Sequence, residues 1–184
     1  MEMKFKGAFD VALPREEVFE VLCDPRKFTP MLPNFHSMEM KDEHTASVRI
    51  KVGIGRIRGT ASTVLTLDEA ESPLRARYVG RGKVMQSAYQ LSCTFDLEEK
   101  PGGGTCINWA SDTELSGKIL SLAGGGLKGY AEKEINNLIL SVQQGLTPGA
   151  PPIILPPERI SWWSRLLAWL RGAKEEQATE PSVP

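Results

Sequence analysis

The sequence has no excess of charge of either sign: 22 Lys and Arg stand against 23 Asp and Glu in 184 residues, a formal net charge of −1. Nucleic-acid-binding domains usually carry a clear basic excess, so we expect no nucleic acid as a partner. No run approaches the roughly 18–20 consecutive apolar residues of a membrane-spanning helix. The first residues mix charges with apolar side chains and do not form a signal-peptide core. We therefore expect a cytoplasmic protein.

Side chains that carry chemistry are also scarce. The chain has three cysteines without a C-x-x-C pair and two histidines, so it lacks a disulfide framework and a recognisable metal site. His44 falls in a predicted turn, and His36 is the one histidine that is a candidate general base. Strand alternation turns the carboxylates of two predicted strands to solvent, namely Asp96, Glu98, Asp112 and Glu114. The sequence thus predicts no metal site and no catalytic residue.

Apolar residues alternate with polar ones through much of the chain, which is typical of half-buried strands. Short polar or Gly-rich segments separate these stretches, so neighbouring strands should form antiparallel hairpins. The pattern predicts seven strands in one meandering sheet. They are Phe5–Val11, Phe35–Lys41, Val48–Val52, Ile57–Leu67, Leu74–Gly82, Tyr89–Leu97 and Thr105–Leu115.

Helical patterns interrupt the strands at two places. Pro14 with two glutamates opens a short helix, and Asp24-Pro25 closes it and begins a second short helix that ends at Met31. A long helix is predicted over 119–144, with an apolar stripe that the sheet must cover. One helix cannot fill the concave face of a seven-stranded curved sheet, so we expect a cavity between them that takes apolar ligands.

Three consecutive glycines occupy positions 124–126 of this predicted helix. Each costs a helix interior about 1 kcal/mol relative to alanine. Either the helix begins later, near Leu127, or the glycines form a hinge at the mouth of the cavity.

Several motifs, in order, resemble the family of carbon monoxide dehydrogenase G subunits. They are Phe5-x-Gly7-x-Phe9-x-Val11, Pro14–Glu17, Leu22-x-Asp24-Pro25 and Leu32-Pro33, followed by Val48-x-Ile50-x-Val52-Gly53, Gly59-Thr60, Gly80-x-Gly82, Gly104-Thr105 and Leu115-x-Gly117-Lys118. The resemblance spans about residues 3–145. Asn34 departs from it, because a glycine commonly follows Leu-Pro in that family.

The resemblance implies an α+β helix-grip fold of the START and polyketide cyclase superfamily: a seven-stranded curved antiparallel sheet wrapped on a long C-terminal helix, with two short helices between the first strands. Members mostly bind lipids, steroids, quinones or other apolar molecules. It also implies a partner, a molybdenum-containing carbon monoxide dehydrogenase-type hydroxylase, which such proteins are thought to link to the membrane and its quinone pool.

The ligand-binding residues should come from inward strand positions and from the elements over the mouth of the cavity. We expect them to be Phe28, Met31, Leu32, Ile57, Met85, Tyr89, Trp109, Leu115, Leu122, Leu127 and Tyr130.

The C-terminal part differs in composition from the predicted domain, which covers residues 1–146. A Pro-rich linker is expected over 147–158, an amphipathic helix over 159–173 and a disordered tail over 174–184. The helix is too short to span a membrane, but its tryptophans and arginines suit the membrane surface. The expected membrane-binding residues are Ile160, Trp162, Trp163, Arg165, Leu166, Leu167, Trp169, Leu170 and Arg171. The alternative is that this helix docks on the domain or on a protein partner.

These observations favour a non-catalytic module that binds an apolar, lipid-like ligand such as a quinone, without a covalent cofactor. It would be tethered peripherally to the inner face of the cytoplasmic membrane and would recruit the hydroxylase there. Two alternatives stay open. One is a polyketide cyclase or hydratase-like enzyme that uses His36, Tyr78 or Tyr89, and the other is a ligand-free assembly factor with a filled interior.

Overall fold

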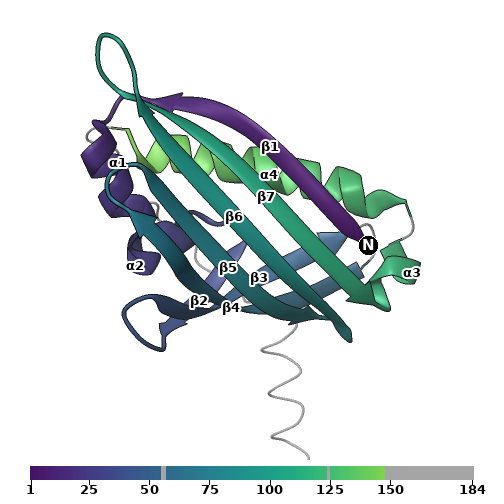
Figure 1. Ribbon diagram of the computed structural model, residues 1–184. Coiled ribbons are helices and arrows are strands. Elements are labelled where there is room, and N and C mark those ends of the chain that lie inside the picture. The colour runs from purple at the N-terminus through teal and green to yellow at the C-terminus, as the bar shows by residue number, and fades with distance from the viewer. Residues whose placement is uncertain (55–56, 124, 148–184) are drawn as a thin grey trace, which may run out of the picture. The chain divides into compact units, whose positions relative to one another are not determined.

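The computed structural model describes residues 1–54, 57–123 and 125–147 (Figure 1). Its strands are β1 (Glu2–Val11), β2 (Phe35–Met40), β3 (Thr45–Ile54), β4 (Ile57–Glu71), β5 (Arg75–Val84), β6 (Ser87–Glu99) and β7 (Thr105–Gly117). Its helices are α1 (Arg15–Leu22), α2 (Pro25–Phe28), the 3₁₀ turn η1 (Thr29–Met31), α3 (Ile119–Ala123) and α4 (Gly126–Gly145).

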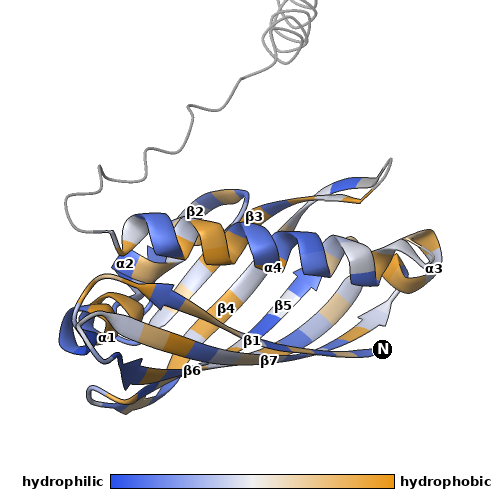
Figure 2. Ribbon diagram, turned by 90° about the horizontal axis from the view of Figure 1, so that it is seen from above, coloured by the Kyte–Doolittle hydropathy of each residue, from blue (hydrophilic) through white to orange (hydrophobic). Residues whose placement is uncertain are grey.

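In this described part the strands form one antiparallel sheet in the order β1-β7-β6-β5-β4-β3-β2. Each strand from β2 to β6 pairs with the next along the chain, and β1 pairs with β7, for example through Phe9 and Ile107. Helix α4 lies along the concave face, with α1 and α2 near one of its ends and α3 near the other (Figures 1 and 2). The predicted α+β class and helix-grip architecture are confirmed.

The short helices follow from local sequence. Glu16 and Glu17 lie in the first turn of α1, where carboxylates complement the helix dipole. Asp24 begins α2, because its carboxylate accepts a hydrogen bond from the backbone N–H of Arg26 at 2.9 Å. Pro30 has no backbone N–H, so the α-helical pattern ends at Phe28 and a 3₁₀ turn follows. The single second helix expected up to Met31 is therefore two short elements.

The predicted helix over 119–144 is also divided. Helix α3 ends at Ala123, and α4 begins at Gly126. Glycine disfavours the helix interior, so the glycine run separates the two elements. A start close to Leu127 is thus correct for α4, and the prediction of one continuous helix from Ile119 is wrong.

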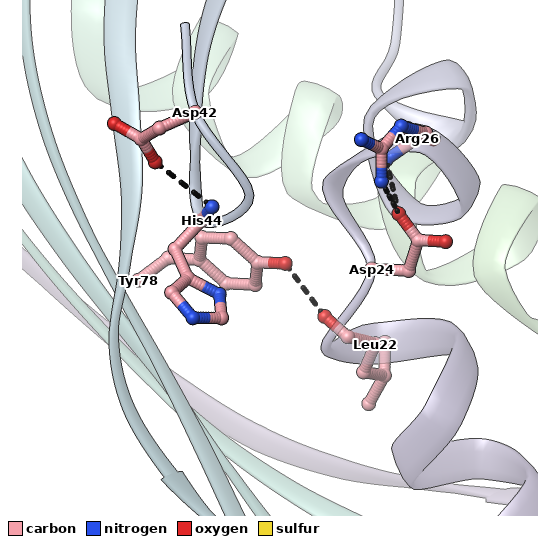
Figure 3. Close-up of polar contacts among 6 residues, drawn as sticks. All are labelled: Leu22, Asp24, Arg26, Asp42, His44 and Tyr78. Atoms are coloured by element: carbon pink, nitrogen blue, oxygen red, sulfur yellow. Dashed lines mark hydrogen bonds and ion pairs between the residues drawn. The ribbon is translucent and has the colours of Figure 1, made fainter. Parts of the chain in front are cut away.

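Two hydrophobic clusters join the sheet to the two ends of α4. One contains Val18, Leu22, Ile107 and Val142, and the other contains Leu115, Ile119 and Leu127. In the first cluster, the hydroxyl of Tyr78 on β5 donates a hydrogen bond to the carbonyl oxygen of Leu22 at 2.7 Å (Figure 3). This bond fixes the end of α1 against the sheet.

Among the described helices, none has the length and apolar character needed to cross a membrane. The side chain of Ile57 and the predicted surface helix and tail lie outside the described residues, as does the linker after Thr147.

Candidate ligand cavity

A cavity of about 340 Å³ lies between α4 and the concave face of the sheet. Its wall consists mainly of aliphatic and aromatic side chains from the strands and from the inner side of α4. The helix supplies Ile135, Leu138, Ile139 and Val142 among others. The size and apolar lining suit a small hydrophobic molecule.

A larger hollow of about 710 Å³ lies on the sheet and differs in character. Polar and charged side chains make up much of its wall, including Asp68, Arg81, Gln90 and Glu114. Such a wall does not offer the apolar surroundings of a hydrophobic ligand site, so the inner cavity is the candidate site.

The structure places many of the predicted ligand-binding residues on the wall of the inner cavity. They are Phe28, Leu32, Tyr89, Trp109, Leu115, Leu127 and Tyr130. Inward strand parity correctly places Tyr89, Trp109 and Leu115, which lie on neighbouring strands β6 and β7.

Three predicted residues do not line the cavity. Leu122 is 58% exposed, because α3 is a separate short helix that buries Ile119 and turns Leu122 to solvent. Met31 is buried in the hydrophobic cluster around α1 and α2. Met85 lies in the turn between β5 and β6 with φ +49° and packs close to Gly59.

Thr63 and Tyr89 form the polar contact that sequence reasoning missed. Their hydroxyl groups are hydrogen-bonded to each other, and both side chains line the cavity. Gly82 on β5 pairs with Thr63 on one side and with Tyr89 on the other. A Cβ atom at Gly82 would overlap the end of the Tyr89 ring, so glycine is required for the ring to lie across β5 and reach Thr63.

The wall also includes the hydroxyl-bearing residues Ser111, Thr113 and Tyr130, and the indole of Trp109. The indole nitrogen is buried and has no hydrogen-bond partner among the described residues. The indole lies against Gly7 on β1, where an added Cβ would be 3.1 Å from Nε1. A buried donor without a partner is unfavourable, and a bound molecule could satisfy this N–H only after a shift of the ring exposes it to the cavity.

The described wall of the cavity includes no Asp, Glu, Lys, Arg or His. Burial raises the pKa of the Cys93 thiol to about 12. Burial also raises the pKa of Tyr89, and the hydrogen bond between Tyr89 and Thr63 only partly opposes this. Both groups are therefore protonated and neutral at physiological pH.

The sequence matches the family model of CoxG, the G subunit of carbon monoxide dehydrogenase, over residues 7–147. The chain belongs to this family. No curated protein matches its sequence.

The fold of this CoxG family member is similar to that of several solved structures. A conserved protein from Geobacillus kaustophilus is 18% identical with a TM-score of 0.70, covering 78% of this chain and 95% of that one. A START superfamily protein from Mycobacterium smegmatis is 10% identical with a TM-score of 0.59, covering 78% and 96%. The Zhui aromatase/cyclase from Streptomyces sp. R1128 is 17% identical with a TM-score of 0.59, covering 78% and 92%. These identities are low, so the likeness shows the helix-grip fold alone.

Asn34, where this chain departs from the glycine expected after Leu-Pro in the CoxG family, has φ +55°. Glycine adopts this left-handed conformation without steric cost, which explains why the family commonly has glycine at this position. Asparagine is among the other residues that tolerate it. The Asn34 side-chain amide also donates a hydrogen bond to the carboxylate of Glu134 on α4 at 2.9 Å. The substitution thus keeps the turn and adds a contact to the helix that covers the cavity.

The residues considered for catalysis do not come together in one site. His36 on β2 and His44 in the following turn are exposed, and neither lines the cavity (Figure 3 shows His44). Tyr78 lines the cavity, but its hydroxyl donates a hydrogen bond to the carbonyl oxygen of Leu22. Within the described part of the chain, no cluster of three or more His, Cys, Asp or Glu residues could hold a metal ion.

Proposed function

We propose that this CoxG family member binds an apolar, lipid-like molecule in the inner cavity without changing it chemically, and that a quinone is one such molecule. The observation that carries the proposal is the apolar cavity between α4 and the sheet. Burial of an aromatic ring system of about 150–250 Å² contributes about 4–6 kcal/mol before the cost of association. An assembly factor without a ligand would instead be expected to have a filled interior.

The chemistry of the wall supports binding without catalysis. General acid–base catalysis needs a titratable group within hydrogen-bond reach of the substrate and with a pKa near the working pH. Cys93 and Tyr89 line the cavity, but burial raises the pKa of each. One of the structural neighbours is an aromatase/cyclase, which keeps an enzyme as the alternative. An enzyme would release a chemically altered product, whereas our proposal predicts that the bound compound is recovered unchanged.

The cellular role that we propose follows from family membership. The CoxG family is named for carbon monoxide dehydrogenase, so the partner is a molybdenum-containing hydroxylase of this type. The proposed role is to recruit the hydroxylase to the inner face of the cytoplasmic membrane. The tether is the amphipathic segment over 159–173, whose apolar residues would enter the interface while Arg165 and Arg171 meet anionic lipid.

Binding of the neutral dye Nile red tests the cavity. Ala61 is 3% exposed and lines the cavity, so Ala61→Phe should fill part of it and weaken dye binding at least about tenfold. Val64 on the same strand is 38% exposed and lines the other hollow, so Val64→Phe is the matched control and should bind the dye like the wild type. Equal binding by both variants, with both folded by circular dichroism, would contradict the proposal.

Flotation with anionic liposomes tests the tether. Deletion of residues 158–184 should leave the domain folded and able to bind Nile red, but should release it from the liposomes. Trp163→Glu with Leu167→Glu should have the same effect in the full chain, because both changes fall on the apolar face of the predicted helix. If the truncated domain floats as well as the full chain does, the segment is not the tether.

A further inference from the structure

The hydroxyl pair of Thr63 and Tyr89 is held in place by the sheet. Thr63 on β4, Gly82 on β5 and Tyr89 on β6 lie in one cross-strand row. The Tyr89 ring crosses the space that a side chain at position 82 would occupy. Thr63 is 8% exposed. Both hydrogen-bonded side chains are among the residues that line the cavity, most of which are apolar.

The hydrogen bonds of this pair are incomplete. Two hydroxyl groups carry two protons, and the bond between them uses one. Neither hydroxyl has another side-chain hydrogen bond among the described residues. One O–H donor therefore remains, and it belongs to side chains that line the cavity. An oxygen acceptor of a bound molecule would satisfy it.

The lack of charged side chains on the described wall also limits which ligands can bind. Within the described residues the cavity has no cationic side chain. A buried carboxylate or phosphate without a cation is strongly unfavourable. An ionised fatty acid or a phospholipid headgroup is therefore unsuited to the interior.

We propose that the ligand is a neutral apolar molecule with a carbonyl oxygen, and that this oxygen accepts the free hydrogen bond of the Thr63–Tyr89 pair. This inference rests on the proposed function and narrows its ligand class. The two residues set specificity by requiring an acceptor, and the uncharged wall excludes acids of similar shape.

The Trp109 indole N–H is one competing position for the ligand oxygen, since it has no partner either. The hydroxyl-bearing residues Ser111, Thr113 and Tyr130 also line the cavity. Tyr89 pairs with Leu115, whereas Trp109 lies six positions away on β7, which is roughly 20 Å along a strand at about 3.3 Å per residue. The hydroxyl pair is favoured because the sheet holds it in place: Gly82 leaves the space through which the Tyr89 ring reaches Thr63. The two positions are far enough apart for mutations to distinguish them.

Equilibrium dialysis of the full chain with three compounds of similar shape tests the proposal. The neutral dicarbonyl is 2,3-dimethyl-1,4-naphthoquinone, whose methyl groups block addition of thiols. The hydrocarbon is 2,3-dimethylnaphthalene, and the anion at neutral pH is 3-methyl-2-naphthoate. The variant Thr63→Val with Tyr89→Phe removes both hydroxyls and nearly keeps the side-chain shapes. The control is Thr45→Val with Thr66→Val, which removes a second hydroxyl pair, 3.3 Å apart, away from the cavity.

We expect the wild type to bind the quinone and to bind the naphthoate at least about tenfold more weakly. The Thr63/Tyr89 variant should lose about tenfold in quinone affinity, the equivalent of one hydrogen bond of about 1.4 kcal/mol. Its affinity for the hydrocarbon should stay within about twofold. The control should match the wild type for all three compounds.

Four results would overturn the inference. Equal losses for quinone and hydrocarbon would mean that the pair only shapes the wall. Naphthoate binding as tight as quinone binding would refute the requirement for a neutral ligand. Loss of quinone preference in Trp109→Phe, but not in the Thr63/Tyr89 variant, would place the oxygen at the indole. If the wild type binds none of the compounds, the proposed function itself fails and the inference fails with it.

Discussion

Gly82→Ala is the most informative single change, because it acts on the sheet position that the Tyr89 ring crosses. An added Cβ would overlap the Cζ atom and hydroxyl oxygen of Tyr89 and would lie 2.8 Å from the backbone oxygen of Ser62. The backbone oxygen has little freedom to move, so the tyrosine must shift. The expected consequence is loss of the bond to Thr63 and displacement of the ring.

The size of the effect follows from three contributions. Overpacking costs about 1–3 kcal/mol, and the lost hydrogen bond costs about 1 kcal/mol. Alanine restricts the unfolded chain more than glycine does, which offsets about 0.4–1 kcal/mol. We therefore expect Gly82→Ala to lower the free energy of unfolding by about 1–3.5 kcal/mol. For a domain of this size each kcal/mol corresponds to about 2–4 °C in Tm.

A double-mutant cycle with Tyr89→Ala, measured by urea unfolding, isolates the contact. In the Tyr89→Ala background the ring is absent, so Gly82→Ala should cost at least about 1 kcal/mol less than in the wild type. Strictly additive effects, or a Gly82→Ala protein as stable as the wild type, would refute the placement of Tyr89 across Gly82.

Three further predictions concern other positions. Gly129 lies within α4, where an added Cβ would meet no atom within 4 Å, so Gly129→Ala should raise the free energy of unfolding by about 0.5–1 kcal/mol in urea; a loss of stability would contradict the open surroundings. Asn34 has φ +55°, so Asn34→Gly should change Tm little, whereas Asn34→Val should lower the free energy of unfolding by at least about 1 kcal/mol; equal effects would refute the left-handed turn. Burial raises the pKa of Cys93 from 9.0 to about 12, so its contribution to stability is complete below pH 9 and is lost as the pH rises through 12. Between about pH 8 and pH 11 the Cys93→Ala variant should therefore lose less free energy of unfolding than the wild type, and parallel losses would show that the thiol is not desolvated.

Much of the fold could be predicted because its signals are local. Alternation within single segments identifies the strands, and the turns between them indicate hairpins, so the meander from β2 to β7 follows without long-range information. The pairing of β1 with β7 is a long-range contact that these local signals do not contain. The same alternation places Tyr89, Trp109 and Leu115 on the inner face. Their positions depend only on strand parity, which the sequence displays directly.

The remaining parts of the site depend on tertiary structure. Thr63 is a common strand residue with no mark of function, and its role arises only because Gly82 opens the space through which Tyr89 reaches it. Leu122 illustrates the opposite error: one continuous helix from Ile119 would carry it over the mouth of the cavity, but it lies on the separate helix α3 and is exposed. Where a helix breaks and which side chain crosses a neighbouring strand are properties of packing.

Native mass spectrometry of the full chain isolated from its own host's membranes, followed by organic extraction, tests the central claim most directly. The account predicts one neutral carbonyl-containing apolar molecule per chain, recovered chemically unchanged, and little or none in the Ala61→Phe variant. A chain that carries no ligand, carries a fatty acid or phospholipid instead, or retains its ligand equally in Ala61→Phe would contradict the account.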